Sequence, residues 1–111
     1  MLRDGKEFLQ DMHDYCSDVL KYLKSTDMSR FSDHGMEYDA IVRKLELIGE
    51  AATHIPESFR KNHPGIPWRR VIALRNVLIH GYFSLDDDII WSILHSDVPV
   101  LLNQLDEILE R

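Results

Sequence analysis

The sequence has little of what holds small secreted or membrane-bound domains together. It contains one cysteine, so no internal disulfide can form, and no apolar run approaches the roughly 18 residues of a membrane span. Glycine and proline number only 5 and 4 among 111 residues, which excludes a low-complexity chain. The first residues are charged and no apolar signal core follows them. We therefore expect a single cytoplasmic domain over residues 1–111, in a reducing compartment and without a membrane partner.

Positive charge is also scarce. Lys and Arg number 13 against 19 Asp and Glu, a formal net charge of −6, which argues against a protein that coats nucleic acid by bulk electrostatics. Five of the cations nevertheless gather in the middle of the chain: Arg60, Lys61, Arg69, Arg70 and Arg75. An acidic body with a basic middle could take RNA into a focused site, and the acidic surface could equally face a basic partner.

What the sequence does have is helical periodicity from end to end. One broad apolar stripe runs from Phe8 to Leu23 and a second from Tyr38 to Ile55. The last apolar segment, 87–109, carries Pro99, at which we expect a kink. A short turn is predicted around residues 57–61. No strand pattern or repeat is present, so the sequence predicts an all-α, up-and-down bundle of four to five helices.

The helix predicted over residues 68–79 differs from the others because apolar residues occur on both of its sides. It should be buried nearly all round, either as the centre of the bundle or as the element through which two chains meet. Residues of several types suggest where helices begin and end. We expect Ser32 or Asp33 to cap the second helix, Gly81 to end the third, and Ser84 to open the last in a capping box with Asp87.

Three reactive polar residues stand at the end of this third helix. Arg75 can bind phosphate as a fork, His80 can exchange a proton near neutral pH, and Tyr82 offers a hydroxyl, a combination that suggests phosphodiester chemistry. Arg75 and His80 point about 140° apart on an ideal helix, whereas Asn76 and His80 share a face with Arg69 near it. For Arg75 and His80 to act on one phosphate, the helix must end before His80 or a second chain must supply the complementary residue.

Each of these residues also has a purely structural explanation. Arg75 lies in an apolar stripe and could be bonded to helix carbonyls or to a carboxylate of the first or second helix. His80 stands at the helix C-terminus, where it could interact favourably with the helix dipole. Glu46, Glu50 and His54 follow at spacings of four residues and could line a metal site, but such a stripe is typical of a solvated outer face. There is no glycine-rich phosphate loop, Ser-His-Asp set or zinc-type cysteine pattern, so we expect no metal and no cofactor.

The arrangement Arg75-x4-His80-x-Tyr82 resembles the signature of the HEPN superfamily, in particular the HepT-like toxins of prokaryotic toxin and antitoxin pairs. The resemblance covers nearly the whole chain and includes further blocks in the same order: Arg43 to Ala52, Ile66 to Trp68, Trp91, and Asp97 to Pro99. It implies a HEPN-like helical bundle that forms a homodimer, in which the Arg-x4-His motifs of two subunits meet in a cleft and cleave RNA without a metal.

The resemblance also implies roles for single residues. Arg75 would bind the scissile phosphate, and His80 would be the general acid or base that deprotonates a ribose 2′-hydroxyl, leaving a 2′,3′-cyclic phosphate. Asn76 and Arg69 would support RNA binding. In this type VII-like toxin-antitoxin system a minimal nucleotidyltransferase antitoxin would AMPylate Tyr82, although Tyr82 could equally pack or stack at the helix end. The alternative function is a non-catalytic HEPN module that binds a nucleotide or docks a nucleotidyltransferase.

Overall fold

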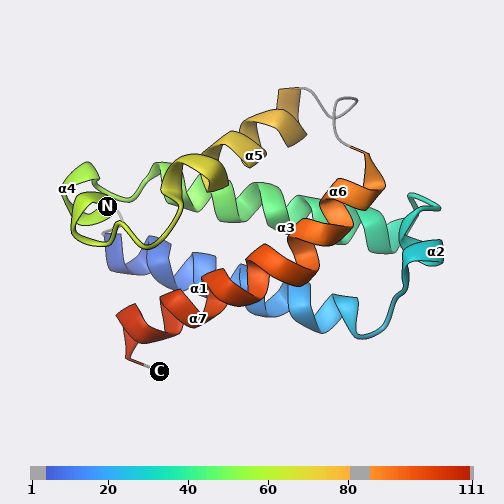
Figure 1. The fold of residues 1–111 in the computed structure, drawn as a ribbon, viewed down its shortest axis with the longest axis horizontal. Helices are drawn as coiled ribbons and strands as arrows, with labels where there is room; N and C mark the ends of the chain where they lie inside the picture. Colours follow the sequence, from blue (N-terminus) through green and yellow to red (C-terminus); the bar gives the residue numbers. More distant parts are fainter. Residues whose placement is uncertain (1–4, 81–85, 111) are drawn as a thin grey trace.

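The computed structural model of the protein describes residues 5–80 and 86–110, and within them every regular element is a helix (Figure 1). The long elements are α1 (Gly5–Leu23), α3 (Met36–Thr53), α5 (Trp68–His80) and a last helix that runs without a break from α6 (Asp87–Ser92) through the π-helical η2 (Ile93–Asp97) into α7 (Val98–Leu109). The short helices α2 (Met28–Phe31) and α4 (Glu57–Asn62) connect them. None of these described helices combines the length and hydropathy that crossing a bilayer requires.

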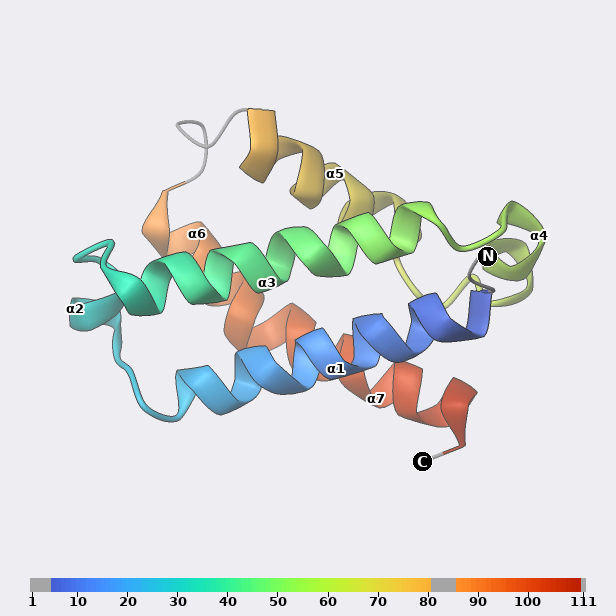
Figure 2. The same ribbon diagram turned by 180° about the vertical axis from the view of Figure 1, so that it is seen from behind.

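The chain runs up and down, as the sequence predicts. Helices α1 and α3 lie antiparallel, α5 rests on α3, and α7 crosses α1 on the other side (Figures 1 and 2). The apolar stripes meet between them because residues spaced three and four apart share one helix face. They form one core of buried side chains that includes Met12, Cys16, Val19, Ile41, Leu45, Ile48, Ala52, Leu101 and Leu105. The prediction of an all-α bundle is therefore confirmed.

Helix α5 is less buried than its sequence predicts. Only Trp68 and Leu78 are buried in it, and Ile79 is 36% exposed. The reason is that α5 packs closely against α3 alone, since a bundle of this size has too few helices to enclose one on every side. The expectation of burial nearly all round, with α5 at the centre of the bundle, was wrong for the single chain. That α5 is the element through which two chains meet stays a prediction.

Pro99 makes the last helix irregular, as the sequence indicates, but does not break it. In the preceding segment the Val98 N–H donates to the Ile93 carbonyl, five residues back, which is the widened turn of a π-helix. Pro99 has no N–H to donate to the turn before it, and the wider turn accommodates that loss within a continuous helix.

The helix caps were predicted less well. The N-cap of α6 is Asp86, whose carboxylate accepts from the Ile89 N–H at 2.9 Å, so the assignment of that role to Ser84 was wrong. The N-cap of α3 is Gly35 with no side-chain bond, because α2 occupies the segment before it and Ser32 ends that short helix. Ser32 and Asp33 were therefore wrong as caps of α3. Gly81 and Ser84 themselves lie outside the described residues.

Candidate functional site

The candidate site is built on the contact between α3 and α5, and Gly49 permits that contact. A Cβ atom added at Gly49 would overlap the Cβ of Arg75 and would lie 3.0 Å from both the Arg75 Cγ and the Val71 carbonyl oxygen. Only glycine leaves room for the two helices to approach this closely. The start of α5 is fixed separately, because the Trp68 Nε1–H donates to the His63 carbonyl at 2.9 Å.

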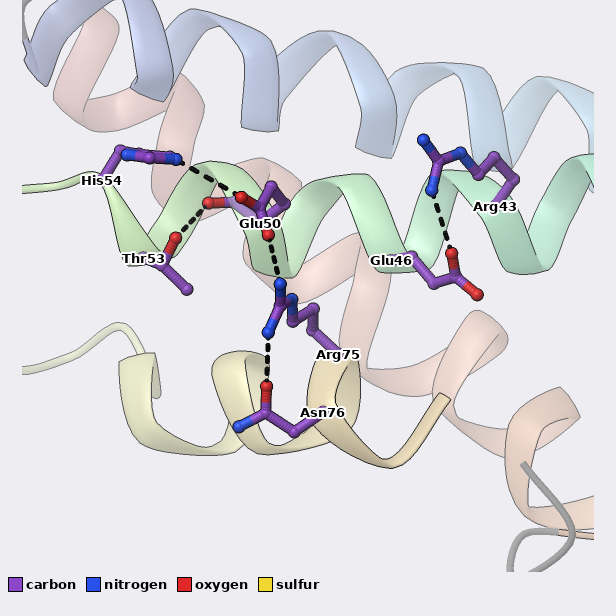
Figure 3. A network of polar contacts seen from close by, with 7 residues as sticks. All are labelled: Arg43, Glu46, Glu50, Thr53, His54, Arg75 and Asn76. Atoms are coloured by element: carbon purple, nitrogen blue, oxygen red, sulfur yellow. Dashed lines mark hydrogen bonds and ion pairs between the residues drawn. The ribbon is translucent and has the colours of Figure 1, made fainter. Parts of the chain in front are cut away.

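Arg75 is held from two sides (Figure 3). Its Nη2 donates to the Glu50 carboxylate on α3 at 2.6 Å, and its Nη1 donates to the Asn76 side-chain oxygen at 2.7 Å. The contact that the structural explanation of Arg75 requires, an ion pair with a carboxylate of the second long helix, is thus present. The pair is only partly buried, with the Arg75 side chain 26% and the Glu50 side chain 43% exposed. A guanidinium carries five N–H donors, so both Nη atoms retain a donor for a further acceptor.

Glu50 has a partner on α5 that sequence reasoning did not assign to it, although its side chain is 43% exposed. It was assigned with Glu46 and His54 to a solvated outer face, whereas its carboxylate points to α5 and also lies 3.4 Å from the His54 Nε2 (Figure 3). Glu46 instead accepts from Arg43 at 3.1 Å. The signal that could have revealed this contact is Gly49, a glycine inside an otherwise regular helix, which often marks a close backbone approach. In the part of the chain that the structure describes, no group of three or more His, Cys, Asp and Glu side chains could hold a metal ion.

His80 is the last residue of α5 and is exposed, and no other described residue forms a hydrogen bond or ion pair with its side chain. Because α5 includes His80, the possibility that the helix ends before it is excluded. Arg75 faces α3 while His80 points about 140° away on the same helix. A single chain therefore does not bring the two side chains onto one phosphate.

Asn76 and Arg69 are exposed, and both lie within about 20° to 40° of the direction of His80 around α5. Asn76 lies between the Arg75 and His80 side chains, because it is one turn before His80 on α5 and its side-chain oxygen accepts a hydrogen bond from Arg75. Four of the five clustered cations lie along a groove between α4 and α5, and only Arg75 turns toward α3. Tyr82 lies outside the described residues.

Comparison with known proteins gives the family. The family model "Ribonuclease HepT-like" matches residues 12–108. A Methanocaldococcus jannaschii protein named "Putative RNase MJ1380" is 38% identical over 104 residues, which are 94% of this chain and 95% of that relative. "Probable ribonuclease HepT" of Thermococcus cleftensis is 32% identical over 108 residues, 97% of this chain and 98% of that relative. No solved structure matches. The chain belongs to the HepT-like ribonuclease family.

Proposed function

We propose that the protein is a metal-independent endoribonuclease whose active site is shared by two copies of the chain. The observation that carries this proposal is the divergence of two preorganised groups on one helix. Arg75 is held by Glu50 and Asn76 with donors to spare, and His80 stands exposed on another face of α5. A two-fold axis beside α5 is the simplest way to set Arg75 of one copy against His80 of the other.

Apolar side chains of α5 that the single chain leaves partly uncovered support such a homodimer. Val77 is only partly buried and Ile79 is 36% exposed, although both belong to a helix rich in apolar residues. A second copy would remove this surface from water, at about 25 cal/mol for each Å² of apolar area buried. Pairing through α5 would place the two copies of the candidate site side by side.

The chemistry follows from the two side chains. A neutral His80 takes the proton of a ribose 2′-hydroxyl, the oxygen attacks the adjacent phosphorus, and the bond to the 5′-oxygen of the next nucleotide breaks. The leaving oxygen takes a proton, which the same His80, now charged, returns to it. Arg75 stabilises the negative charge on the phosphoryl oxygens as a two-pronged donor. The products are a 2′,3′-cyclic phosphate and a 5′-hydroxyl, formed without a metal ion.

Mixing two inactive variants tests the shared site. We expect Arg75→Ala and His80→Ala each to lose RNA cleavage in the presence of a chelator. In a mixed dimer, one site keeps Arg75 from one copy and His80 from the other, so random re-pairing of the two variants should recover about a quarter of wild-type activity. Failure of the mixture to recover, with wild-type protein active, would contradict the shared site. A substrate with 2′-deoxyribose at the cleaved position must resist cleavage, and equal cutting of DNA would overturn the mechanism.

We further propose that a minimal nucleotidyltransferase antitoxin silences the enzyme by AMPylating Tyr82, where a bulky phosphate near His80 would obstruct RNA. Intact-mass measurement after co-expression with such a partner tests this. AMP additions should appear in the wild type and be absent from Tyr82→Phe. Additions that survive this substitution would contradict the assignment.

One observation favours the second candidate function, a non-catalytic module that docks a nucleotidyltransferase or binds a nucleotide. The ion pair with Glu50 gives Arg75 a structural partner, so its presence in the helix does not by itself require catalysis. The comparison of wild-type protein with His80→Ala separates the two functions. Equal absence of RNA cleavage in both would favour the module.

A further inference from the structure

A groove beside the candidate site is lined by four cationic residues and one acidic residue, although the chain as a whole is acidic. It lies between α4 and α5, has a volume of about 710 Å³, and is open to solvent. Its cationic lining residues are Arg60, Lys61, Arg69 and Arg70, and its lining includes one acidic residue, Glu57. Its apolar lining includes Pro64, Pro67, Trp68 and Ile72. We call it the α4–α5 groove.

Three of the four cations of this groove are available to a ligand, whereas the Arg60 Nε donates to the Ile55 carbonyl at 3.1 Å. The structure describes no ion pair or hydrogen bond of the Arg69 side chain, and that residue is exposed. Lys61 lies 3.7 Å from Glu57 and Arg70 lies 3.4 Å from Asp97, in pairs whose side chains are 50% to 76% exposed. Exposed pairs of this kind are worth about 0–1 kcal/mol, so a phosphate can replace the carboxylate. The groove therefore offers several cations to one polyanion.

The groove leads to His80. On α5, Arg69, Asn76 and His80 follow one another at intervals of seven and four residues, which places them along one face of the helix. Arg69 and Asn76 line the groove and His80 lies one turn beyond it. At 1.5 Å per residue, this row extends over about 16 Å from Arg69 to His80. A strand whose phosphate lies at His80 would pass directly into the groove.

We propose that the α4–α5 groove binds the single-stranded RNA that flanks the cleaved phosphate. Arg69 and Lys61 bind backbone phosphates along its edge, and the apolar lining receives base faces, in the manner of sequence-tolerant single-strand binding. This inference rests on the proposed function for its substrate class. An acidic peptide would also be attracted by the cations, but the row of residues that continues to His80 and the apolar lining favour RNA.

Binding can be tested without cleavage. The probe is a short oligouridine, labelled at one end and fully 2′-O-methylated so that it cannot be cut, and binding is followed by fluorescence anisotropy at several salt concentrations. The Arg69→Ala and Lys61→Ala double variant should bind about 10-fold more weakly. Its plot of log affinity against log salt should lose a slope of about 1.4, or 0.7 for each phosphate contact removed.

Lys24→Ala is the matched control. It removes one exposed cation just after α1 ends, at the opposite end of the bundle from α4 (Figures 1 and 2), and it should bind and unfold like the wild type. Oligouridine affinity equal in all three proteins would overturn the proposal. So would binding of a polyglutamate peptide that depends on Arg69 and Lys61 while the oligouridine does not bind. Because both residues are exposed, the double variant should keep the wild-type melting temperature, so loss of fold cannot imitate the expected result.

Cleavage kinetics separate this inference from the proposed function. Relative to a dinucleotide substrate, kcat/KM for a long RNA should fall about 10-fold in the double variant, through KM rather than kcat. His80→Ala should lose cleavage of the long RNA and of the dinucleotide equally. If the wild type cleaves nothing while oligouridine binding still depends on Arg69 and Lys61, the groove stands and the ribonuclease mechanism fails. If the wild type cleaves RNA and the double variant has the same kcat/KM for the long RNA, the proposed role of the groove is wrong while the ribonuclease mechanism stands.

Discussion

Replacing Gly49 with alanine tests the physical basis of the site, because two effects of the substitution have opposite signs. Gly49 lies inside α3, where alanine is favoured over glycine by about 1 kcal/mol through helix propensity. From the sequence alone, Gly49→Ala should therefore stabilise the protein. The structure predicts the reverse, because the new methyl group would overlap the Arg75 Cβ on α5.

The size of the effect follows from which atoms collide. The Arg75 Cβ and the Val71 carbonyl oxygen are fixed by the backbone of α5, so the overlap cannot be relieved by rotating a flexible side chain. Overpacking of this kind typically costs about 1–3 kcal/mol, and a collision with backbone-fixed atoms belongs at the upper end of that range. After the gain in helix propensity, the free energy of unfolding should fall by about 2 kcal/mol.

The effect on activity should exceed the effect on stability. To accept the methyl group, α5 must move away from α3, and that movement lengthens the 2.6 Å bond between Arg75 and Glu50. A misplacement of about 1 Å in a catalytic group can reduce the rate about 100-fold. We therefore expect Gly49→Ala to lose most RNA cleavage under conditions where it remains folded.

Urea unfolding followed by circular dichroism measures the first effect, and cleavage of a labelled RNA measures the second. Gly65→Ala is the matched control, since the nearest atom to an added Cβ there is the Gln104 Nε2 at 3.9 Å. It should unfold at or slightly above the wild-type midpoint. The reasoning is refuted if Gly49→Ala is as stable as the wild type or more stable, because helix propensity alone would then describe the position.

Three further predictions concern other parts of the fold. Burial raises the pKa of the Cys16 thiol to about 12, so a maleimide should label it only when the chain opens, and the free energy of unfolding should be intact below about pH 9 and decline as the pH rises toward 12; rapid labelling of native protein at neutral pH would contradict this. Asp86→Ala should cost about 1 kcal/mol by removing the N-cap of α6, and an unchanged urea midpoint would show that the cap contributes nothing. The double variant Glu50→Leu with Arg75→Met should keep its stability within about 1 kcal/mol of the wild type while losing RNA cleavage, whereas retained cleavage would remove Arg75 from the mechanism.

Sequence reasoning predicted what depends on local periodicity and missed what depends on how helices meet. The stripe from Phe8 to Leu23 corresponds to α1, and the irregular turn at Pro99 could be predicted because proline lacks an N–H wherever it stands. The burial of α5 was overestimated, since periodicity records which residues are apolar but not how many neighbours a helix has. Glu50 was assigned to the solvent because only the position of α5, set by Gly49, shows that the carboxylate has a partner.

The ion pair between Arg75 and Glu50 bears on whether Arg75 serves the fold or the chemistry. A pair whose side chains are 26% and 43% exposed gains little from mutual attraction, because water screens it, and apolar residues of similar volume often replace such pairs without loss of stability. Stability is therefore a weak reason for a guanidinium in an otherwise apolar stripe of α5. The proposed role of a preorganised hydrogen-bond donor to phosphate is a stronger one, since Glu50 and Asn76 would fix the direction of the guanidinium before RNA arrives, and catalysis gains most from groups that need no rearrangement. In the proposed ribonuclease the ion pair would then serve both the fold and the chemistry, because α3 would hold Arg75 in place for a phosphate bound between α5 and a second chain.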